Sequence, residues 1–199
     1  MSVDEATPIT EPETVDGSIA EGTAQDLEDG RTRCAWVRDR PEHYLFHDAE
    51  WGRLPQDELP CFELVMLSCF TRDMPLVDVL DQRMPIFEAF AEWDYETVAK
   101  ADDAALQAMV ERGGLFASVD RLKWIRDVAA ACVDLKGEFK GVRQYFLAMP
   151  AMDAEEQLEN VAARFPGFTP EDAARLIQMM GCVGGAIEQW SHERDCWIY

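Results

Sequence analysis

The sequence predicts an all-α fold, and two observations carry that prediction. Apolar residues recur every three or four positions in several segments, which is the spacing that puts side chains on one face of a helix. No segment alternates apolar and polar residues for long enough to predict a sheet. The chain has 199 residues, of which 48% are hydrophobic and 10% aromatic. That length and composition suit one domain with a buried core.

The first 30 residues differ from the rest. They contain nine acidic residues, no Lys or Arg and no aromatic residue. We expect residues 1–30 to form a disordered acidic tail and residues 31–199 to form the helical domain. The tail lacks the basic start and apolar run of a signal peptide. No stretch of the chain approaches the ~18 apolar residues that a membrane span needs, so a cytoplasmic protein is expected.

The first two helices of the domain core are predicted from apolar spacing and prolines. Leu59 and Phe70 bound a run whose apolar residues are three and four apart. A second helix begins behind Pro75 and continues to Leu80, and Pro85 is expected to break it.

The later helices are predicted from their ends. The segment 102–112 reads as a helix closed by Gly113-Gly114. Ser118 can cap the next helix through its hydroxyl. Thr169 begins Thr-Pro-Glu-Asp, in which a capping hydroxyl precedes a proline and two acids, as at the start of many helices.

The charge is strongly negative. Asp and Glu number 39 against 18 Lys and Arg, a formal net charge of -21, of which -12 remains on residues 31–199. DNA-binding proteins normally carry a basic surface, so the chain as a whole repels DNA. An acid-rich surface with four lysines suits a high-salt cytoplasm as a hypothesis. The acidic tail could also bind a protein partner, and we expect a monomer.

Two pairs of Cys and His have metal-ligand spacing. Cys34 and His47 form Cys-x12-His, and His192 and Cys196 form His-x3-Cys near the other end of the domain. Together they make a Cys2His2 set, the donors of closed zinc sites. Spacing alone does not favour it, because most cysteines and histidines of cytoplasmic proteins bind nothing. His43 could replace His47 or bind beside it. The six cysteines are expected to be thiols, with a disulfide framework unlikely.

Two stretches resemble one enzyme family. RCAWVRDRPEHYLFHDAEWG (33–52) contains Cys-x-Trp and then His-Asp-x-Glu-Trp-Gly at the distance found in the bacterial DNA-3-methyladenine glycosylase I family, and HERDC (192–196) is similar to its terminal His-x3-Cys. The likeness covers residues 33 to about 135 and, more loosely, 167–199. It implies an all-helical helix-hairpin-helix DNA glycosylase whose chain ends are joined by one structural zinc, with Cys34, His47, His192 and Cys196 as ligands.

The resemblance also implies a pocket for a flipped base. Trp36, His43, Phe46 and Trp51 match its aromatic positions, while Asp48, Glu50 and Trp51 are more readily explained as braces of the turn. The segment after the matched helix departs from the family. Ser68 stands where the family has its base-recognising Glu, and Leu76 stands where it has a stacking Trp. Asp73 could supply a carboxylate instead, or could be a solvated loop acid beside Arg72.

The DNA-binding hairpin of the family corresponds to Gly113, Gly114, Ser118 and Arg121. Backbone N–H groups of such a hairpin and nearby cations hold phosphates. The glycines are equally well explained as a helix stop.

The function that these features favour is release of an alkylated purine from damaged double-stranded DNA, with altered base specificity. The alternative is a catalytically inactive member that binds DNA lesions or a protein. A hydrolase of small molecules has no feature in its favour.

Overall fold

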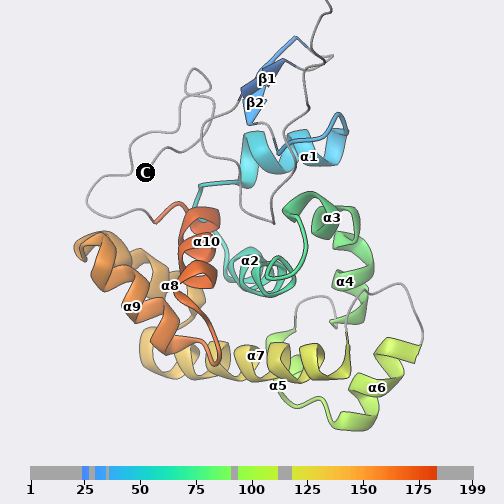
Figure 1. Ribbon diagram of the computed structural model, residues 1–199. Helices are drawn as coiled ribbons and strands as arrows, with labels where there is room; N and C mark the ends of the chain where they lie inside the picture. The colour runs from blue at the N-terminus through green and yellow to red at the C-terminus, as the bar shows by residue number, and fades with distance from the viewer. Residues whose placement is uncertain (1–23, 27–29, 35, 91–93, 112–117, 183–199) are drawn as a thin grey trace, which may run out of the picture.

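The computed structural model describes residues 24–26, 30–34, 36–90, 94–111 and 118–182. This part of the chain is mostly helical, as the sequence predicts (Figure 1). The elements in chain order are the strands β1 (Ala24–Asp26) and β2 (Thr32–Cys34), the helices α1 (Pro41–Leu45), η1 (Phe46–Glu50, a π-helix), α2 (Glu58–Phe70), α3 (Leu76–Asp81), α4 (Arg83–Ala89), α5 (Tyr95–Ala99), α6 (Asp103–Glu111), α7 (Val119–Phe139), α8 (Val142–Ala148), η3 (Met149–Ala151, a 3-10 helix), α9 (Ala154–Arg164) and α10 (Pro170–Met180).

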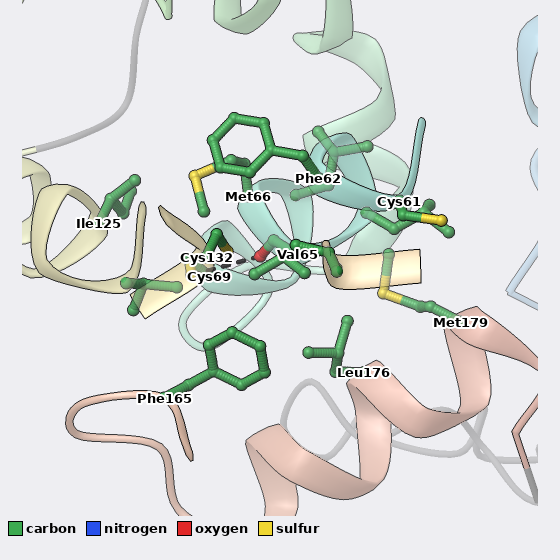
Figure 2. Close-up of a cluster of buried hydrophobic side chains, with 14 of the residues drawn as sticks. Cys61, Phe62, Val65, Met66, Cys69, Ile125, Cys132, Phe165, Leu176 and Met179 are labelled. Atoms are coloured by element: carbon green, nitrogen blue, oxygen red, sulfur yellow. Dashed lines mark hydrogen bonds between the residues drawn. The ribbon is translucent and has the colours of Figure 1, made fainter. Parts of the chain in front are cut away.

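Helix α2 lies at the centre of the domain (Figure 1). It contacts α7, α8 and α10, and every residue from Leu64 to Phe70 is buried. Figure 2 shows side chains of α2 such as Val65 and Met66 between those of α7 and α10. A helix that is apolar on almost all sides is stable only when others surround it. The core therefore forms around α2 and fixes where its C-terminal end lies.

The predicted helix ends agree with the structure where they lie within the described residues. Ser118 Oγ accepts a hydrogen bond from the backbone N–H of Arg121 at 3.1 Å and begins α7. Thr169 and Asp172 form a reciprocal capping box at the start of α10. Gly113 and Gly114 lie outside the described residues.

The prediction for Pro85 was wrong in its position. The break after α3 falls at Gln82, and Pro85 lies inside the first turn of α4. The first N–H groups of a helix have no partner within it, so a proline there removes no hydrogen bond.

A short antiparallel ribbon adds a feature that periodicity did not reveal. Strand β1 pairs with β2, with Ala24 opposite Cys34 and Asp26 opposite Thr32. Three-residue strands are too short to produce a recognisable alternation. The ribbon joins the end of the expected acidic tail to the start of the domain.

Two glycines join the early and late parts of the fold. Gly181 ends α10 with φ +66°, and Gly52, with φ +69°, follows the turn after η1. A Cβ on Gly181 would lie 2.1 Å from the carbonyl oxygen of Gly52. This approach requires glycine at 181 and places the end of α10 against the end of the His-Asp-x-Glu-Trp-Gly motif.

Among the described residues, none of the helices combines the length and the apolar character needed to cross a membrane.

Candidate functional site

Three aromatic residues expected at the pocket come together near the start of the domain. The ring centres of Trp36 and Trp51 are 5.3 Å apart, and those of Phe46 and Trp51 are 6.2 Å apart. Phe46 is fully buried and Trp51 is 3% exposed. Trp36 is partly exposed, and its Nε1 is a buried donor that finds no partner among the described residues. We call Trp36, Phe46 and Trp51 the aromatic cluster.

His43 lies on α1 and contacts α3. Its Nε2 is 2.9 Å from Asp81 Oδ1, and the side chain is fully buried. Asp81 also pairs with Arg40 at 2.7 Å. The second ring nitrogen of His43, Nδ1, has no hydrogen-bond partner in the part of the chain that the structure describes. The described contacts thus hold His43 by α3, and whether it faces a base stays a prediction.

Ser68, which the resemblance aligns with a base-recognising Glu, has a hydroxyl that already has a partner. Its Oγ donates to the carbonyl oxygen of Val65 at 2.7 Å, within α2, and the residue is 2% exposed. Leu76, at the position of the stacking Trp, is 8% exposed and belongs to the core. Neither side chain carries the carboxylate or the indole ring that the resemblance implies at these two positions.

The loop that follows α2 is fixed to two other helices. Arg72 Nε donates to Asp172 of α10 at 3.1 Å, and its Nη2 donates to the Gly167 carbonyl oxygen at 2.6 Å. Asp73 forms an ion pair with Arg121 of α7. The Asp172 carboxyl is nearly buried, which alone would raise its pKa, but the hydrogen bonds from Arg72 and Thr169 outweigh burial and lower the pKa. Asp73 therefore has a cation as its neighbour.

The charged residues of the motif brace the turn, as predicted. Arg83 donates to both carboxylate oxygens of Glu50, at 2.9 and 2.7 Å, and to both of Glu63, at 2.6 and 3.0 Å. Burial opposes the charged form of Arg83, yet the hydrogen bonds to Glu63 and Glu50 raise its pKa. A cleft of about 460 Å³ opens beside this ion-pair group, with Leu64 in its wall.

Two of the four expected metal ligands lie within the described residues, and they are adjacent. His47 Nδ1 is 2.9 Å from Asp48 Oδ1, and the backbone N–H of Cys34 points at His47 Nε2 from 3.5 Å. Arg33, itself 2% exposed, binds Asp48 with two hydrogen bonds of 2.9 and 2.6 Å. Burial alone would raise the pKa of Asp48, but these bonds from Arg33 and His47 lower it.

The other two expected ligands, His192 and Cys196, lie outside the described residues. Within the described part, no group of three or more His, Cys, Asp or Glu side chains has the arrangement of a metal site. Cys34 is disulfide-bonded, unlike the thiol that we expected, and the other described cysteines are free: Cys61, Cys69, Cys132 and Cys182.

Only part of the expected DNA-binding hairpin can be described. Ser118 caps α7 through its side chain, so its Oγ is already an acceptor for the helix. Arg121 lies in the first turn of α7, where its Nη1 donates to the Cys69 carbonyl oxygen at 2.9 Å.

Sequence reasoning missed the group formed by Trp124, Arg72 and Asp172. The only sequence feature that could have indicated this group is the charge pair Arg72-Asp73, at positions where the resemblance implies small residues.

Comparisons with known proteins agree on one family. The methyladenine glycosylase family model matches residues 36–179. DNA-3-methyladenine glycosylase of Haemophilus influenzae is 31% identical over 85 residues, which are 43% of this chain and 46% of that protein. DNA-3-methyladenine glycosylase 1 of Escherichia coli is 25% identical over 104 residues, 52% of this chain and 56% of that protein. The matched region thus spans about half the length of these relatives.

Solved structures show the same fold. A crystal structure of 3-methyladenine DNA glycosylase I matches with a TM-score of 0.67 and 18% identity, covering 76% of this chain and 93% of that one. A Tyr-to-Phe variant of 3-methyladenine DNA glycosylase I, in complex with 3-methyladenine, matches with a TM-score of 0.69 and 14% identity, covering 80% and 96%. The Staphylococcus aureus enzyme matches with a TM-score of 0.67 and 14% identity, covering 76% and 90%.

Proposed function

Because the chain belongs to the methyladenine glycosylase family, we propose that it is a base-excision repair N-glycosylase that acts on alkylated DNA. The family match along residues 36–179 carries this proposal. The reaction breaks the bond between a purine nitrogen and the sugar C1′, and water supplies the oxygen of the new C1′–O bond. The base leaves with the bonding electrons, and water loses one proton.

The aromatic cluster would hold the flipped base, since an enzyme of this class must take its base out of the duplex. Stacking on an aromatic ring contributes about 1–3 kcal/mol per base. An alkylated purine carries a positive charge and leaves readily, so the reaction needs little help from an acid. This explains how a site with Ser68 and without a carboxylate could still release a base.

Altered base specificity follows from the same change. A hydrogen bond to a charged group contributes about 1.5–3 kcal/mol, and the Ser68 hydroxyl, bonded to Val65, replaces that charge. We expect weaker discrimination of 3-methyladenine from other methylated purines than a pocket with a carboxylate would give, by a factor of about 10 to 150.

The test is chromatography of the bases released from methylated duplex DNA. Phe46→Leu should reduce release, and Phe62→Leu is the matched control, because Phe62 is equally buried in the same core but lies on α2, outside the aromatic cluster. Ser68→Glu should increase release of 3-methyladenine. If no base is released but the protein binds damaged duplex at low salt, the chain is the binding module that we named as the alternative. Equal loss in Phe46→Leu and Phe62→Leu would contradict a role for the aromatic cluster.

DNA would be gripped between α6 and α7. The segment between these helices would serve as the hairpin of a helix-hairpin-helix unit, with Gly113 and Gly114 as its turn. A repair enzyme needs access to the chromosome, which makes the cytoplasm the proposed site of action. The acidic tail would bind a protein partner or dissolved salt ions, and not DNA.

A structural zinc is part of the proposal. The hydrogen bond from His47 Nδ1 to Asp48 and the Cys34 N–H aimed at Nε2 both require the tautomer that leaves a lone pair on Nε2. A carboxylate bonded to the distal nitrogen is typical of metal-binding histidines. Cys34 and His47 would hold one side of the ion, and His192 and Cys196 the other. The ion would tie the chain ends together and take no part in the reaction.

Zinc requires Cys34 as a thiolate, and a disulfide at the same sulfur excludes it. Metal analysis of protein purified with a reductant should therefore give about one zinc per chain, the stoichiometry of a single closed site. Cys34→Ser should lose the metal, and Cys61→Ser, a buried cysteine elsewhere, should keep it. Absence of zinc from the reduced wild-type protein would contradict the proposal.

A further inference from the structure

Three arginines gather where the end of α2 meets the first turns of α7 and α10. The Arg72 guanidinium lies 3.9 Å from the centre of the Trp124 ring, and that of Arg121 lies 5.6 Å from the same centre. Arg175 Nη1 lies 3.6 Å from Asp172 Oδ1, the carboxylate that also binds Arg72. We call Arg72, Arg121 and Arg175 the arginine cluster. It concentrates positive charge in a chain whose net charge is -21.

The two carboxylates beside the arginine cluster differ in how firmly they are held. The Asp172 side chain is 5% exposed, and it accepts bonds from Arg72 and from the backbone and hydroxyl of Thr169. The Asp73 side chain is 61% exposed, and its one contact within the described residues is Arg121. Exposed ion pairs of this kind contribute little to stability. Asp172 is therefore a fixed part of the fold, whereas Asp73 can leave.

Arg121 is held in place independently of Asp73. Its Nη1 donates to the Cys69 carbonyl oxygen, and its side chain is 17% exposed. Burial and the nearby positive charge of Arg72 lower the pKa of Arg121, so an anion is favoured at this point. Arg72 Nη1 makes no hydrogen bond among the described residues, and the side chain is 30% exposed. Both guanidiniums lie by the Trp124 ring and keep N–H groups that an added anion could bind.

We propose that Asp73 is a built-in substitute for a phosphate of the DNA backbone. In the free protein its carboxylate occupies Arg121. When DNA binds, a phosphate displaces Asp73 and is held by Arg121 and Arg72 beside Trp124. The identification of the phosphate as that of DNA rests on the proposed function, whereas the anion site itself does not. Asp73 is then neither a catalytic residue nor a reader of the base.

The exchange is favourable for two reasons. A phosphate group accepts bidentate bonds from a guanidinium through its two non-bridging oxygens, as a carboxylate does, and it can bind two arginines at once. The site also lies in the first turn of α7, directly after the segment that would form the DNA-binding hairpin. A carboxylate at this point keeps free arginines from binding other anions until a phosphate arrives together with the rest of the duplex.

The experiment compares Asp73→Asn with Glu96→Gln in binding to a duplex that contains a tetrahydrofuran abasic-site analogue, which cannot undergo base release. Glu96 is also an exposed carboxylate, paired with Lys136 away from the arginine cluster, so Glu96→Gln makes the same change in net charge. Fluorescence anisotropy across a KCl series should show Asp73→Asn binding about 1.5- to 5-fold more tightly than wild type. Its log–log salt slope should steepen by up to about 0.9. Glu96→Gln should change neither.

A second measurement follows the arginine Nε–H signals by NMR while inorganic phosphate is added. The signals of Arg72 and Arg121 should shift at lower phosphate concentration in Asp73→Asn than in wild type. Affinity and slope of Asp73→Asn equal to those of Glu96→Gln would overturn the proposal. So would loss of base release in Asp73→Asn with DNA affinity unchanged. If no form binds duplex yet phosphate shifts both signals, the glycosylase proposal fails and the anion site stands; if phosphate shifts neither, the anion site fails as well.

Discussion

Replacing Gly181 with Ala tests the contact that joins the two parts of the domain. An Ala at φ +66° costs about 1–2 kcal/mol because its Cβ crowds the backbone. That Cβ would also lie 2.1 Å from the Gly52 oxygen and 2.4 Å from its carbonyl carbon, so the backbone has to move. Such overpacking adds about 1–3 kcal/mol. The free energy of unfolding should fall by about 2–5 kcal/mol out of the ~5–15 that domains have, which lowers Tm by about 4–20 °C.

Two other glycines separate these contributions when all three variants are unfolded by heat and by urea, with circular dichroism as the signal. Gly30 has φ +76°, and a Cβ added there would meet nothing within 4 Å, so Gly30→Ala should lose only about 1–2 kcal/mol. Gly137 lies inside α7 with open space around it, so Gly137→Ala should gain about 0.5–1 kcal/mol. If Gly181→Ala loses no more than Gly30→Ala, the close approach to Gly52 does not exist.

Three further predictions concern individual side chains. The lowered pKa of Asp172 means that its ionised form stabilises the fold above the unfolded pKa of about 3.9, and this stabilisation disappears as the pH falls through the folded pKa. Asp172→Asn should therefore lower the free energy of unfolding at neutral pH and flatten its decline in acid; an unchanged decline would refute this. Glu58 accepts hydrogen bonds from the first N–H groups of α8, at 2.6 and 2.9 Å. Glu58→Ala should cost about 1–3 kcal/mol in urea unfolding, and a smaller loss than in Glu96→Ala would contradict that role. Burial raises the pKa of Cys61 and Cys182 to about 12, so both should react with a thiol reagent only after unfolding. Rapid labelling of these cysteines in the native protein would refute this.

The parts of the fold that the sequence predicts are those with local signals. The helix from Glu58 to Phe70 and the caps at Ser118 and Thr169 depend on residues within one or two turns of each other. The close approach of Gly52 and Gly181 could not be foreseen, because no spacing rule relates positions so far apart in the chain. The same holds for the ribbon formed by β1 and β2, whose strands are too short to show a period.

The candidate site divides in the same way. The rings of Trp36, Phe46 and Trp51 lie in contact, and their role as a base pocket stays a prediction. The partners of the rewritten loop were not predictable, because Arg72 and Asp172 are 100 residues apart in the chain and their pairing depends on how α10 packs on α2. A loop acid such as Asp73 has the same sequence signal whether it binds a base, a cation or water. Only its position next to Arg121 distinguishes these cases.

The central place of α2 has a consequence for how such a protein can change. Helices α7, α8 and α10 enclose its side chains, so a substitution along its length changes the packing of the interior around it. Beyond its last turn the chain moves outward, from the buried Thr71 to Asp73, whose side chain is 61% exposed, so a new polar side chain there meets solvent. Chemistry at this rim can therefore diverge between relatives while the architecture beneath it persists.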